Sequence, residues 1–200
     1  PLKVVIENYP ETEEESFTAV NNPEDESAGT RQIPFARELY IERRDFMEEP
    51  VKKFRRLAPG REVRLRYACL ATCTGCVKDA EGKVTEVRCR MDMESRGGSA
   101  PDGRKVKGTI HWVSAKHAVA AEIRQYDRLF NVEDPAGQKD GSDFKDHLNP
   151  DSLQTIIGLI EPSAARLSPG TRIQFERTGY YCVDPDSTSE RIVFNRTVPL

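Results

Sequence analysis

Arginine is concentrated in one short stretch of this 200-residue chain. Arg55, Arg56, Arg64 and Arg66 place four guanidinium groups within 12 residues. A guanidinium group donates hydrogen bonds in a fixed fork, which matches a phosphate or the major-groove edge of guanine. If Arg64 and Arg66 lie on one strand, their side chains share a face. The pattern favours a site that binds nucleic acid, and the alternative interpretation is a solvated charged surface.

The segment Arg172–Glu176 carries a second candidate set. On a strand, Gln174 and Glu176 share one face, while the apolar Ile173 and Phe175 turn to the other. Amide and carboxylate groups can bond to the exposed edges of unstacked bases. The alternative is an ordinary barrel strand with a polar outer face.

The net charge of −3 conceals a strong segregation of charge along the chain. Residues 1–50 carry 5 basic and 13 acidic side chains, residues 51–128 carry 18 and 9, and residues 129–200 carry 7 and 11. A basic block between acidic flanks is typical of a nucleic-acid-binding face. The sequence pI of about 5.8 lies below the range usual for such proteins, so a surface that merely sorts by sign stays open.

Four of the five cysteines fall between residues 69 and 89, and Cys73 and Cys76 have the spacing of a zinc-ribbon pair. The flanking residues predict a β-hairpin, Val63–Val77 and Lys83–Met93, around the turn at 79–82. Residues three apart on a strand point to opposite faces, so Cys73 and Cys76 could not share a metal without a bulge. The hairpin also brings Cys89 near Cys73. We expect neither a metal site nor a structural disulfide.

The sequence lacks the motifs of common catalytic sites. It contains no glycine-rich phosphate loop, no G-x-S-x-G and no H-E-x-x-H pattern. His111, His117 and His147 lie apart in the sequence, and we expect each at the surface or in packing. Trp112 and Tyr126 are also expected to pack in the interior. We therefore predict no catalytic residue in this chain.

Short β-rich runs recur between turn signals, which is typical of a β-barrel or a sandwich. The expected strands are Leu2–Glu7, Ser16–Val20, Glu38–Glu42, Glu62–Ala71, Val84–Met91, Thr109–Val113, Glu122–Phe130, Gln154–Ile160, Arg172–Glu176, Tyr180–Val183 and Arg191–Val198. One helix is predicted over Asp45–Leu57 with Asp45 as its cap, and short helical turns at 114–119 and 163–167. No apolar run approaches the roughly 20 residues of a membrane span, and no signal peptide is seen, so we expect a cytosolic location.

Several blocks of the sequence, in order, resemble the C-terminal anticodon-binding region of glutaminyl-tRNA synthetases. They are PLKVVIENYP at the start, RQIPF at Arg31–Phe35, EVRLR at Glu62–Arg66, DGRKVKG at Asp102–Gly108, the stretch Gly108–Phe130, FER at Phe175–Arg177 and VFNRTV at Val193–Val198. The string IHWVSAKHA within Gly108–Phe130 favours the glutaminyl over the related glutamyl enzymes. The blocks are spread over nearly all 200 residues.

This resemblance implies an all-β fold of two β-barrels of the ribosomal-protein-L25-like type, one inserted in the other, with short helices. Residues 1–26 and 114–200 would form the barrel proximal to the catalytic body, and residues 27–113 the distal one. The implied partners are the anticodon loop of glutamine tRNA and an upstream catalytic domain of the same chain. That domain would attach glutamine using ATP and Mg²⁺, as a class I synthetase. The fragment itself would need no cofactor, touch no membrane and be a monomer.

The resemblance also implies roles for the candidate residues. Arg56 corresponds to a residue that binds guanine at the third anticodon position, and Gln174 and Glu176 to residues that hold the middle uracil. Arg64 corresponds to a residue near the first base and its phosphate, with Arg55 and Arg66 in supporting roles. The alternatives are the tail of a glutamyl-tRNA synthetase of archaeal or eukaryotic type, or a barrel that binds ribosomal RNA or protein.

Overall fold

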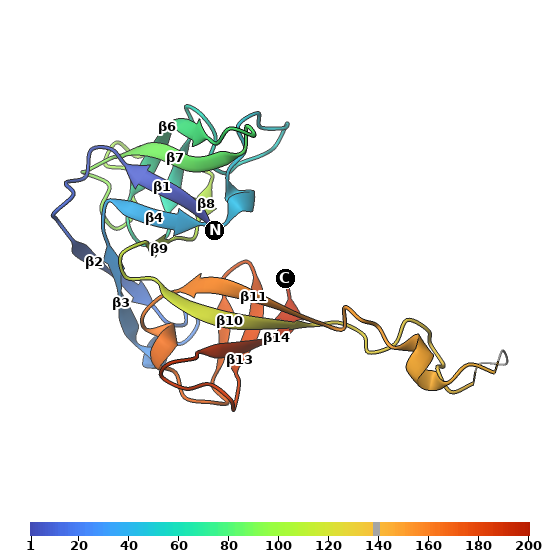
Figure 1. Cartoon of the computed structure of the whole chain (residues 1–200). Coiled ribbons are helices and arrows are strands. Elements are labelled where there is room, and N and C mark those ends of the chain that lie inside the picture. Colours follow the sequence, from blue (N-terminus) through green and yellow to red (C-terminus); the bar gives the residue numbers. More distant parts are fainter. Residues whose placement is uncertain (138–140) are drawn as a thin grey trace. The chain divides into compact units, whose positions relative to one another are not determined.

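The computed structural model describes residues 1–137 and 141–200, which are built mainly of β-strands (Figure 1). The strands are β1 (Leu2–Ile6), β2 (Glu15–Val20), β3 (Thr30–Phe35), β4 (Glu38–Ile41), β5 (Glu62–Leu65), β6 (Leu70–Lys78), β7 (Val84–Met91), β8 (Thr109–Ile110), β9 (Val113–Ser114), β10 (Val119–Tyr126), β11 (Leu153–Ile160), β12 (Arg172–Phe175), β13 (Gly179–Val183) and β14 (Val193–Pro199). The helices are short 3-10 turns, η1 (Glu26–Ala28), η2 (Arg43–Asp45), η3 (Phe144–His147) and η4 (Ala164–Arg166). None of the helices in this described part is long and apolar enough to cross a membrane. The prediction of a mainly β protein is confirmed.

The chain divides into two compact units. The first comprises residues 1–119 and 159–164, and the second comprises residues 120–158 and 165–200. The N-terminal residues belong to the first unit because β1 forms its sheet with β4 and β7, which both lie in that unit.

A seven-stranded sheet with the order β8-β5-β6-β7-β1-β4-β9 curls around the core of the first unit (Figure 1). Its strand β1 runs antiparallel to β4 and parallel to β7. Alternate residues of a strand face opposite sides, so Leu2, Val4 and Ile6 are fully buried while the residues between them are half-buried. Strands β2 and β3 form a separate antiparallel pair.

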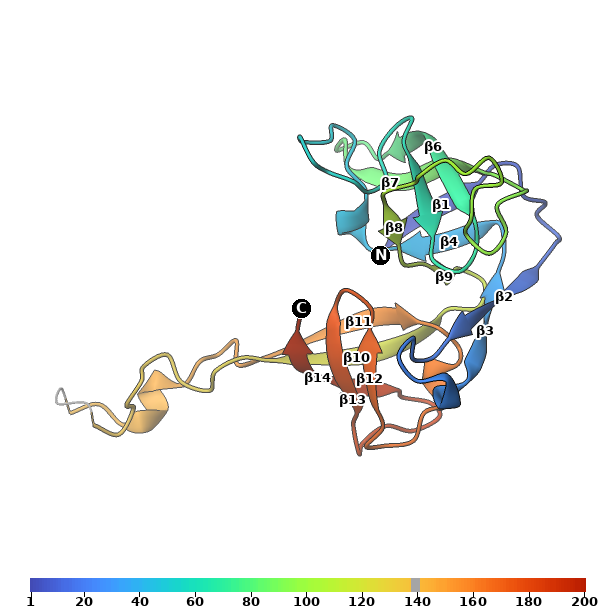
Figure 2. The same cartoon turned by 180° about the vertical axis from the view of Figure 1, so that it is seen from behind.

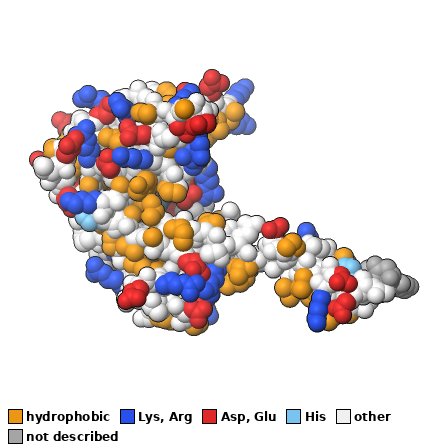
Figure 3. All heavy atoms as spheres, viewed as in Figure 1, with side chains coloured by type: hydrophobic (Ala, Val, Ile, Leu, Met, Phe, Trp, Pro, Cys, Tyr) orange, Lys and Arg blue, Asp and Glu red, His pale blue; other side chains and the backbone are white. Residues whose placement is uncertain are grey.

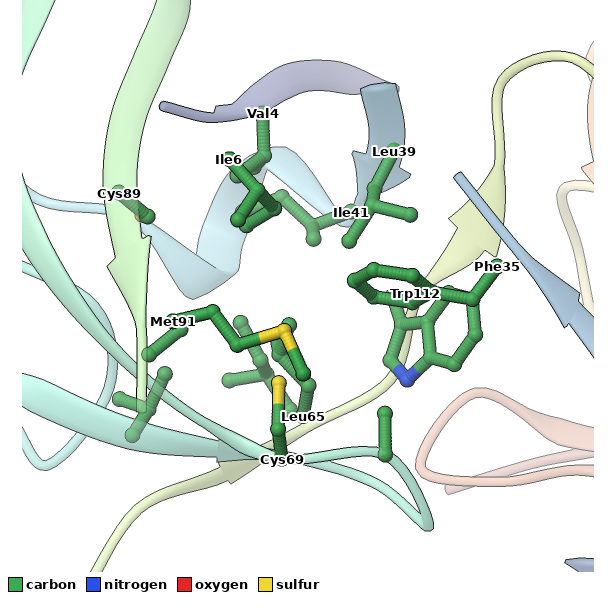
Figure 4. Close-up of a cluster of buried hydrophobic side chains, with 14 of the residues drawn as sticks. Val4, Ile6, Phe35, Leu39, Ile41, Leu65, Cys69, Cys89, Met91 and Trp112 are labelled. Carbon is green, nitrogen blue, oxygen red and sulfur yellow. The ribbon is translucent and has the colours of Figure 1, made fainter. Parts of the chain in front are cut away.

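Aromatic rings meet edge to face in the core of the first unit. The ring of Phe35 lies 5.2 Å from that of Trp112 and 5.1 Å from that of Tyr9, measured between centroids. Figure 4 shows Phe35 and Trp112 beside the aliphatic side chains of Leu39 and Ile41. The indole N–H of Trp112 donates a 2.9 Å hydrogen bond to the carbonyl of Arg66, so its polar atom is satisfied inside. The predicted packing role of Trp112 is confirmed.

Strands β6 and β7 form the predicted hairpin, except that its first arm begins at Leu70 rather than Val63 because a turn separates β5 from β6, and Cys73 lies directly opposite Cys89. The register shifts between Cys73 and Gly75, which leaves Cys73 buried and Cys76 half-buried. All five cysteines are free thiols. Among residues 1–137 and 141–200, no group of three or more histidine, cysteine or acidic side chains is placed to hold a metal ion.

The second unit is a five-stranded sheet with the order β11-β10-β14-β13-β12, seen from behind in Figure 2. Strands β10 and β14 run parallel, whereas β12, β13 and β14 are antiparallel neighbours. One face of this sheet carries an aromatic cluster. The ring of Phe175 lies 4.8 Å from that of Tyr181 and 5.2 Å from that of Phe194.

The helix predicted over Asp45–Leu57 is wrong. Helix η2 ends at Asp45, and the following residues form a loop closed at its base by two hydrogen bonds. The Leu57 amide donates to the Asp45 carbonyl at 2.9 Å, and the Met47 amide donates to the Leu57 carbonyl at 3.1 Å. Pro50 has no amide hydrogen to continue a helix, and the Asp45 carboxylate is buried in an ion pair with Arg56 rather than capping one.

The remaining differences are local. Strand β3 was not predicted, because its Pro34 lowers the strand signal of a sequence that nevertheless pairs along its whole length with β2. Tyr126 is 51% exposed, so the prediction that it packs inside is wrong. The predicted helical turn at 163–167 is confirmed by η4, and the one at 114–119 is a single turn in which the Ala118 amide donates to the Ser114 carbonyl.

Candidate nucleic-acid interface

Two of the predicted arginines lie on the loop that follows η2. The parallel bridge between Phe46 and Leu57 anchors both ends of this loop, and Leu57 is 1% exposed. Lys53, within the loop, has a positive φ of 77°, a conformation that turns the chain sharply. The loop thereby brings Arg55 to the surface and Arg56 back beside η2.

The guanidinium group of Arg56 is held by two oxygens. Its Nε lies 3.3 Å from a carboxylate oxygen of the fully buried Asp45, and its Nη1 donates to the Arg44 carbonyl at 3.2 Å. The side chain is nevertheless 39% exposed. Arg56 is therefore fixed in orientation while part of its fork faces solvent, which is the arrangement that planar recognition of a base or a phosphate requires.

A shallow pocket of about 220 Å³ lies beside this loop. Its lining consists of Phe54, Arg55, Arg56, Arg61, Glu62, Lys107 and Gly108. Four of these residues are cations and one is an aromatic ring, so the pocket combines the donors for a phosphate with a surface on which a base can lie. Lys and Arg side chains gather at the edge of the first unit that carries η2 and the following loop (Figure 3).

The pocket also contains residues that the sequence analysis did not single out. Arg61 donates a hydrogen bond from Nη1 to the Phe54 carbonyl and so holds the loop in place. Lys107 belongs to the segment DGRKVKG, two residues after Lys105. The sequence alone does not show that this segment meets the loop at 54–56. The sequence feature that could have indicated Arg61 and Lys107 is the high density of basic residues in the two segments that carry them.

Arg64 and Arg66 do not join this pocket. Strand β5 ends at Leu65, so Arg66 lies in the turn toward β6 and the expected shared strand face is interrupted there. The Arg64 side chain donates from Nε to the Gly98 carbonyl. The Arg66 guanidinium lies 4.9 Å from the centre of the Tyr67 ring, a cation–π contact. Both arginines are half-buried, and each side chain is in contact with a neighbouring residue of the first unit.

The second candidate set lies on the hairpin of β12 and β13 in the second unit. Gln174 is exposed, while Phe175 and Ile173 turn inward as predicted. Strand β12 ends at Phe175, so Glu176 lies in the hairpin turn rather than on the strand. That turn is closed by the Thr178 amide and hydroxyl, which both donate to the Phe175 carbonyl at 2.9 Å. Gln174 thus lies on a strand and Glu176 in a turn, so the two residues do not share a strand face as expected.

An ion network beside the pocket braces the loop at 101–108. Arg104 donates to Glu62 at 2.7 Å, to Asp92 at 2.5 Å and to Asp102 at 3.0 Å. These side-chain hydrogen bonds raise the pKa of Arg104 and lower the pKa of Asp92, while the pKa of Asp102 is lowered first by the backbone amide of Arg104 and then by its side chain. One guanidinium group therefore connects β5, the end of β7 and the loop that leads to Lys107.

Comparison with known proteins assigns this arrangement to a family. Two family models match, at residues 1–92 and 109–184, and both describe the anticodon-binding domain of class I tRNA synthetases (E and Q). The chain is 58% identical over 200 residues to a protein named glutamine–tRNA ligase from Nitrobacter hamburgensis, covering 100% of this chain and 35% of the relative. It is 56% identical to a protein of the same name from Rhodopirellula baltica, covering 33% of it, and 52% identical to one from Xanthomonas campestris, covering 35%.

The chain thus spans about a third of the length of these relatives. Taken with the cationic pocket beside η2 and the exposed polar groups of the β12–β13 hairpin, the two matches identify the chain as a member of the anticodon-binding domain family of the class I tRNA synthetases for glutamate and glutamine.

Proposed function

We propose that this chain is the anticodon-binding part of a glutamine–tRNA ligase and binds the anticodon loop of glutamine tRNA. The observation that carries the proposal is the pocket in which Arg56, fixed by Asp45, lies beside Arg55, Arg61 and Lys107. An anticodon is read when its unstacked bases enter pockets and bond through their exposed edges. A fixed but partly exposed guanidinium fork suits the edge of guanine, and the neighbouring cations suit the phosphates that flank it.

We assign the roles of the individual residues as the resemblance to glutaminyl-tRNA synthetases implies. Arg56 bonds to the guanine at the third anticodon position, and Gln174 and Glu176 hold the middle uracil. Arg64 serves the first base and its phosphate, with Arg55 and Arg66 in support. The exposure of Gln174 and the partial exposure of Arg56 support these roles, since each side chain can reach a ligand without any movement of the backbone.

The activity of the whole protein is also part of this proposal. The catalytic domain upstream of this chain attaches glutamine to the tRNA with ATP and Mg²⁺, and the present chain contributes recognition only. We propose further that the protein acts as a monomer and that the two compact units are barrels of the ribosomal-protein-L25-like type, one inserted in the other. The curled seven-stranded sheet, and the return of residues 159–164 to the first unit, support this architecture.

A glutamyl-tRNA synthetase tail is the second candidate, because the family models cover both enzymes. The names of the relatives quoted above favour glutamine. The two candidates differ in the tRNA that they select, so one binding comparison between glutamine and glutamate anticodon stem-loops separates them.

The test is a set of four binding measurements with anticodon stem-loop RNA. Wild type and Arg56→Ala are each measured with guanine or adenine at the third anticodon position. Loss of Arg56 should weaken binding to the guanine RNA by about 1–3 kcal/mol, and much less to the adenine RNA, because the contact is already absent there. Arg56→Lys keeps the charge beside Asp45 but loses the fork. Like Arg56→Ala, it should weaken binding to the guanine RNA more than binding to the adenine RNA.

Arg88→Ala provides the control, since Arg88 is a 52% exposed arginine of the same unit that does not line the pocket. Arg88→Ala should weaken binding to the two RNAs slightly and by the same factor. Strict additivity of the Arg56 substitution and the base change would show that Arg56 is only a surface charge.

A further inference from the structure

Tyr180 and Gln174 face each other on the exposed side of the β12–β13 hairpin. They are direct partners in the antiparallel register, so their side chains project from the same face of the sheet. Gln174 is exposed, and Tyr180 is 45% exposed. The neighbouring Tyr181 projects to the opposite face, where it packs against Phe175. The two adjacent tyrosines therefore serve different purposes.

The Tyr180 ring is held by no aromatic contact and no hydrogen bond within the described residues. No ring contact or hydrogen bond of its side chain is found there, whereas Tyr126, the other exposed tyrosine on a strand of this sheet, donates from its hydroxyl to Asn195 at 3.0 Å. The backbone of Tyr180 is by contrast well fixed. Its carbonyl accepts from the Thr197 hydroxyl at 3.1 Å, at the point where a bulge shifts the register with β14.

The surroundings of the ring complete the chemistry of a base site. Val198, its partner on β14, is 51% exposed and extends the apolar surface. Arg172 is exposed two residues from Gln174 and so lies on the same face of β12. A flat ring, an amide and a cation on one face match the three parts of an unstacked nucleotide, namely its π-surface, its hydrogen-bonding edge and its phosphate.

We propose that Tyr180 is the stacking wall for the base that Gln174 reads, an unstacked pyrimidine of the single-stranded anticodon loop. The inference rests on the proposed function and adds a residue and a contact to it. Gln174 selects the base through its edge, Tyr180 holds the base against the sheet, and Arg172 attracts the adjoining phosphate. Base stacking is tolerant of sequence, so Tyr180 contributes affinity at the middle position while Gln174 contributes the discrimination.

The experiment uses an anticodon stem-loop with a fluorescent uridine analogue at the middle position, whose emission is quenched when it stacks on an aromatic ring. The wild-type chain should quench this emission on binding. Tyr180→Phe should keep both the quench and the affinity, because the ring remains. Tyr180→Ala and Tyr180→Leu should lose the quench and bind about tenfold more weakly or worse, in the range seen when base-stacking aromatics are replaced by alanine.

Tyr126→Ala is the matched control and should keep both the quench and the affinity. Absence of a quench with the wild-type chain, or an equal loss with Tyr126→Ala, would overturn the stacking role. The stacking role also fails if Tyr180→Ala binds like wild type while Gln174→Ala is impaired, and the proposed function then stands. If the wild-type chain does not distinguish a middle uracil from a middle cytosine, the proposed function fails and the inference fails with it. Thermal unfolding of each variant shows that the compared proteins are folded.

Discussion

Gly108 lies directly against the backbone carbonyl of Arg55. A Cβ added at Gly108 would overlap that oxygen, closer than any real contact. The carbonyl of Gly108 in turn accepts a 2.7 Å hydrogen bond from the Arg64 amide. One glycine therefore joins the loop that carries Arg55 and Arg56 to strand β5, and its small size sets the spacing of the pocket.

Gly108→Ala should consequently destabilise the first unit and displace the loop at 54–56. The clash is with backbone, which cannot rotate away, so we expect a loss of about 1–3 kcal/mol in the free energy of unfolding, the range for an overpacked core. Denaturant unfolding measures the loss. Gly75→Ala is the control, because a Cβ there meets nothing within 4 Å and the substitution should be nearly neutral. Equal stability of the two variants would contradict the close packing at Gly108.

RNA binding by this chain should depend strongly on salt. Each phosphate neutralised on a single strand adds about 0.7 to the slope of log K against log salt, so three contacts give a slope of about −2. Titration of an anticodon stem-loop at several salt concentrations gives the slope. Lys107→Gln should reduce the magnitude of this slope by the value of about one phosphate contact, as expected for a cation of the pocket. An affinity that is constant between low and physiological salt would exclude a phosphate-binding pocket.

The Arg104 network should make stability depend on pH in the acid range. The Arg104 side chain is the largest cause of the lowered pKa of Asp92 in the folded chain and a smaller cause of that of Asp102, which the Arg104 backbone amide lowers most. A carboxyl group with a lowered folded pKa contributes stability above its unfolded pKa, near 3.9, and this stability is lost as the pH falls through the lowered value.

Wild type should therefore exceed Arg104→Gln in stability at neutral pH, and the difference should shrink as the pH falls below about 4. Circular dichroism during urea unfolding at a series of pH values measures both proteins. A difference that stays constant across the series would assign the effect of the substitution to packing and not to these carboxylates.

The hairpin cysteines should respond differently to substitution. Cys73 is 1% exposed in the core and its thiol has only a long 3.5 Å contact with the Gly75 carbonyl, so Cys73→Ser buries a hydroxyl there and should cost about 1–3 kcal/mol. Cys76 is half-buried beyond the register shift, so Cys76→Ser should be nearly neutral. Purified chain should contain well under one zinc per molecule by elemental analysis. Stoichiometric zinc that is lost on substitution of Cys76 would show that the bulge allows a metal site.

The sequence by itself determined where most strands lie. In Val87–Met91, apolar residues alternate with polar ones, and this local period of two survives in the fold because every second side chain enters the core. The hairpin of β6 and β7, with Cys73 opposite Cys89, was equally predictable, since a short turn fixes the register of the two strands it joins. The resemblance carried by the sequence blocks indicated the family, which composition and periodicity could not have done.

Tertiary structure decided the rest, because it depends on residues far apart in the chain. The parallel pairing of β1 with β7 and of β10 with β14 leaves no local signal. The predicted helix after Asp45 gave way to a loop, since burial of that carboxylate against Arg56 and the close approach of Gly108 to Arg55 hold the loop from outside its own sequence. The pocket exists only because this loop, Arg61 and Lys107 meet in space. The arginines could thus be chosen from the sequence, but which of them share a pocket was set by non-local packing.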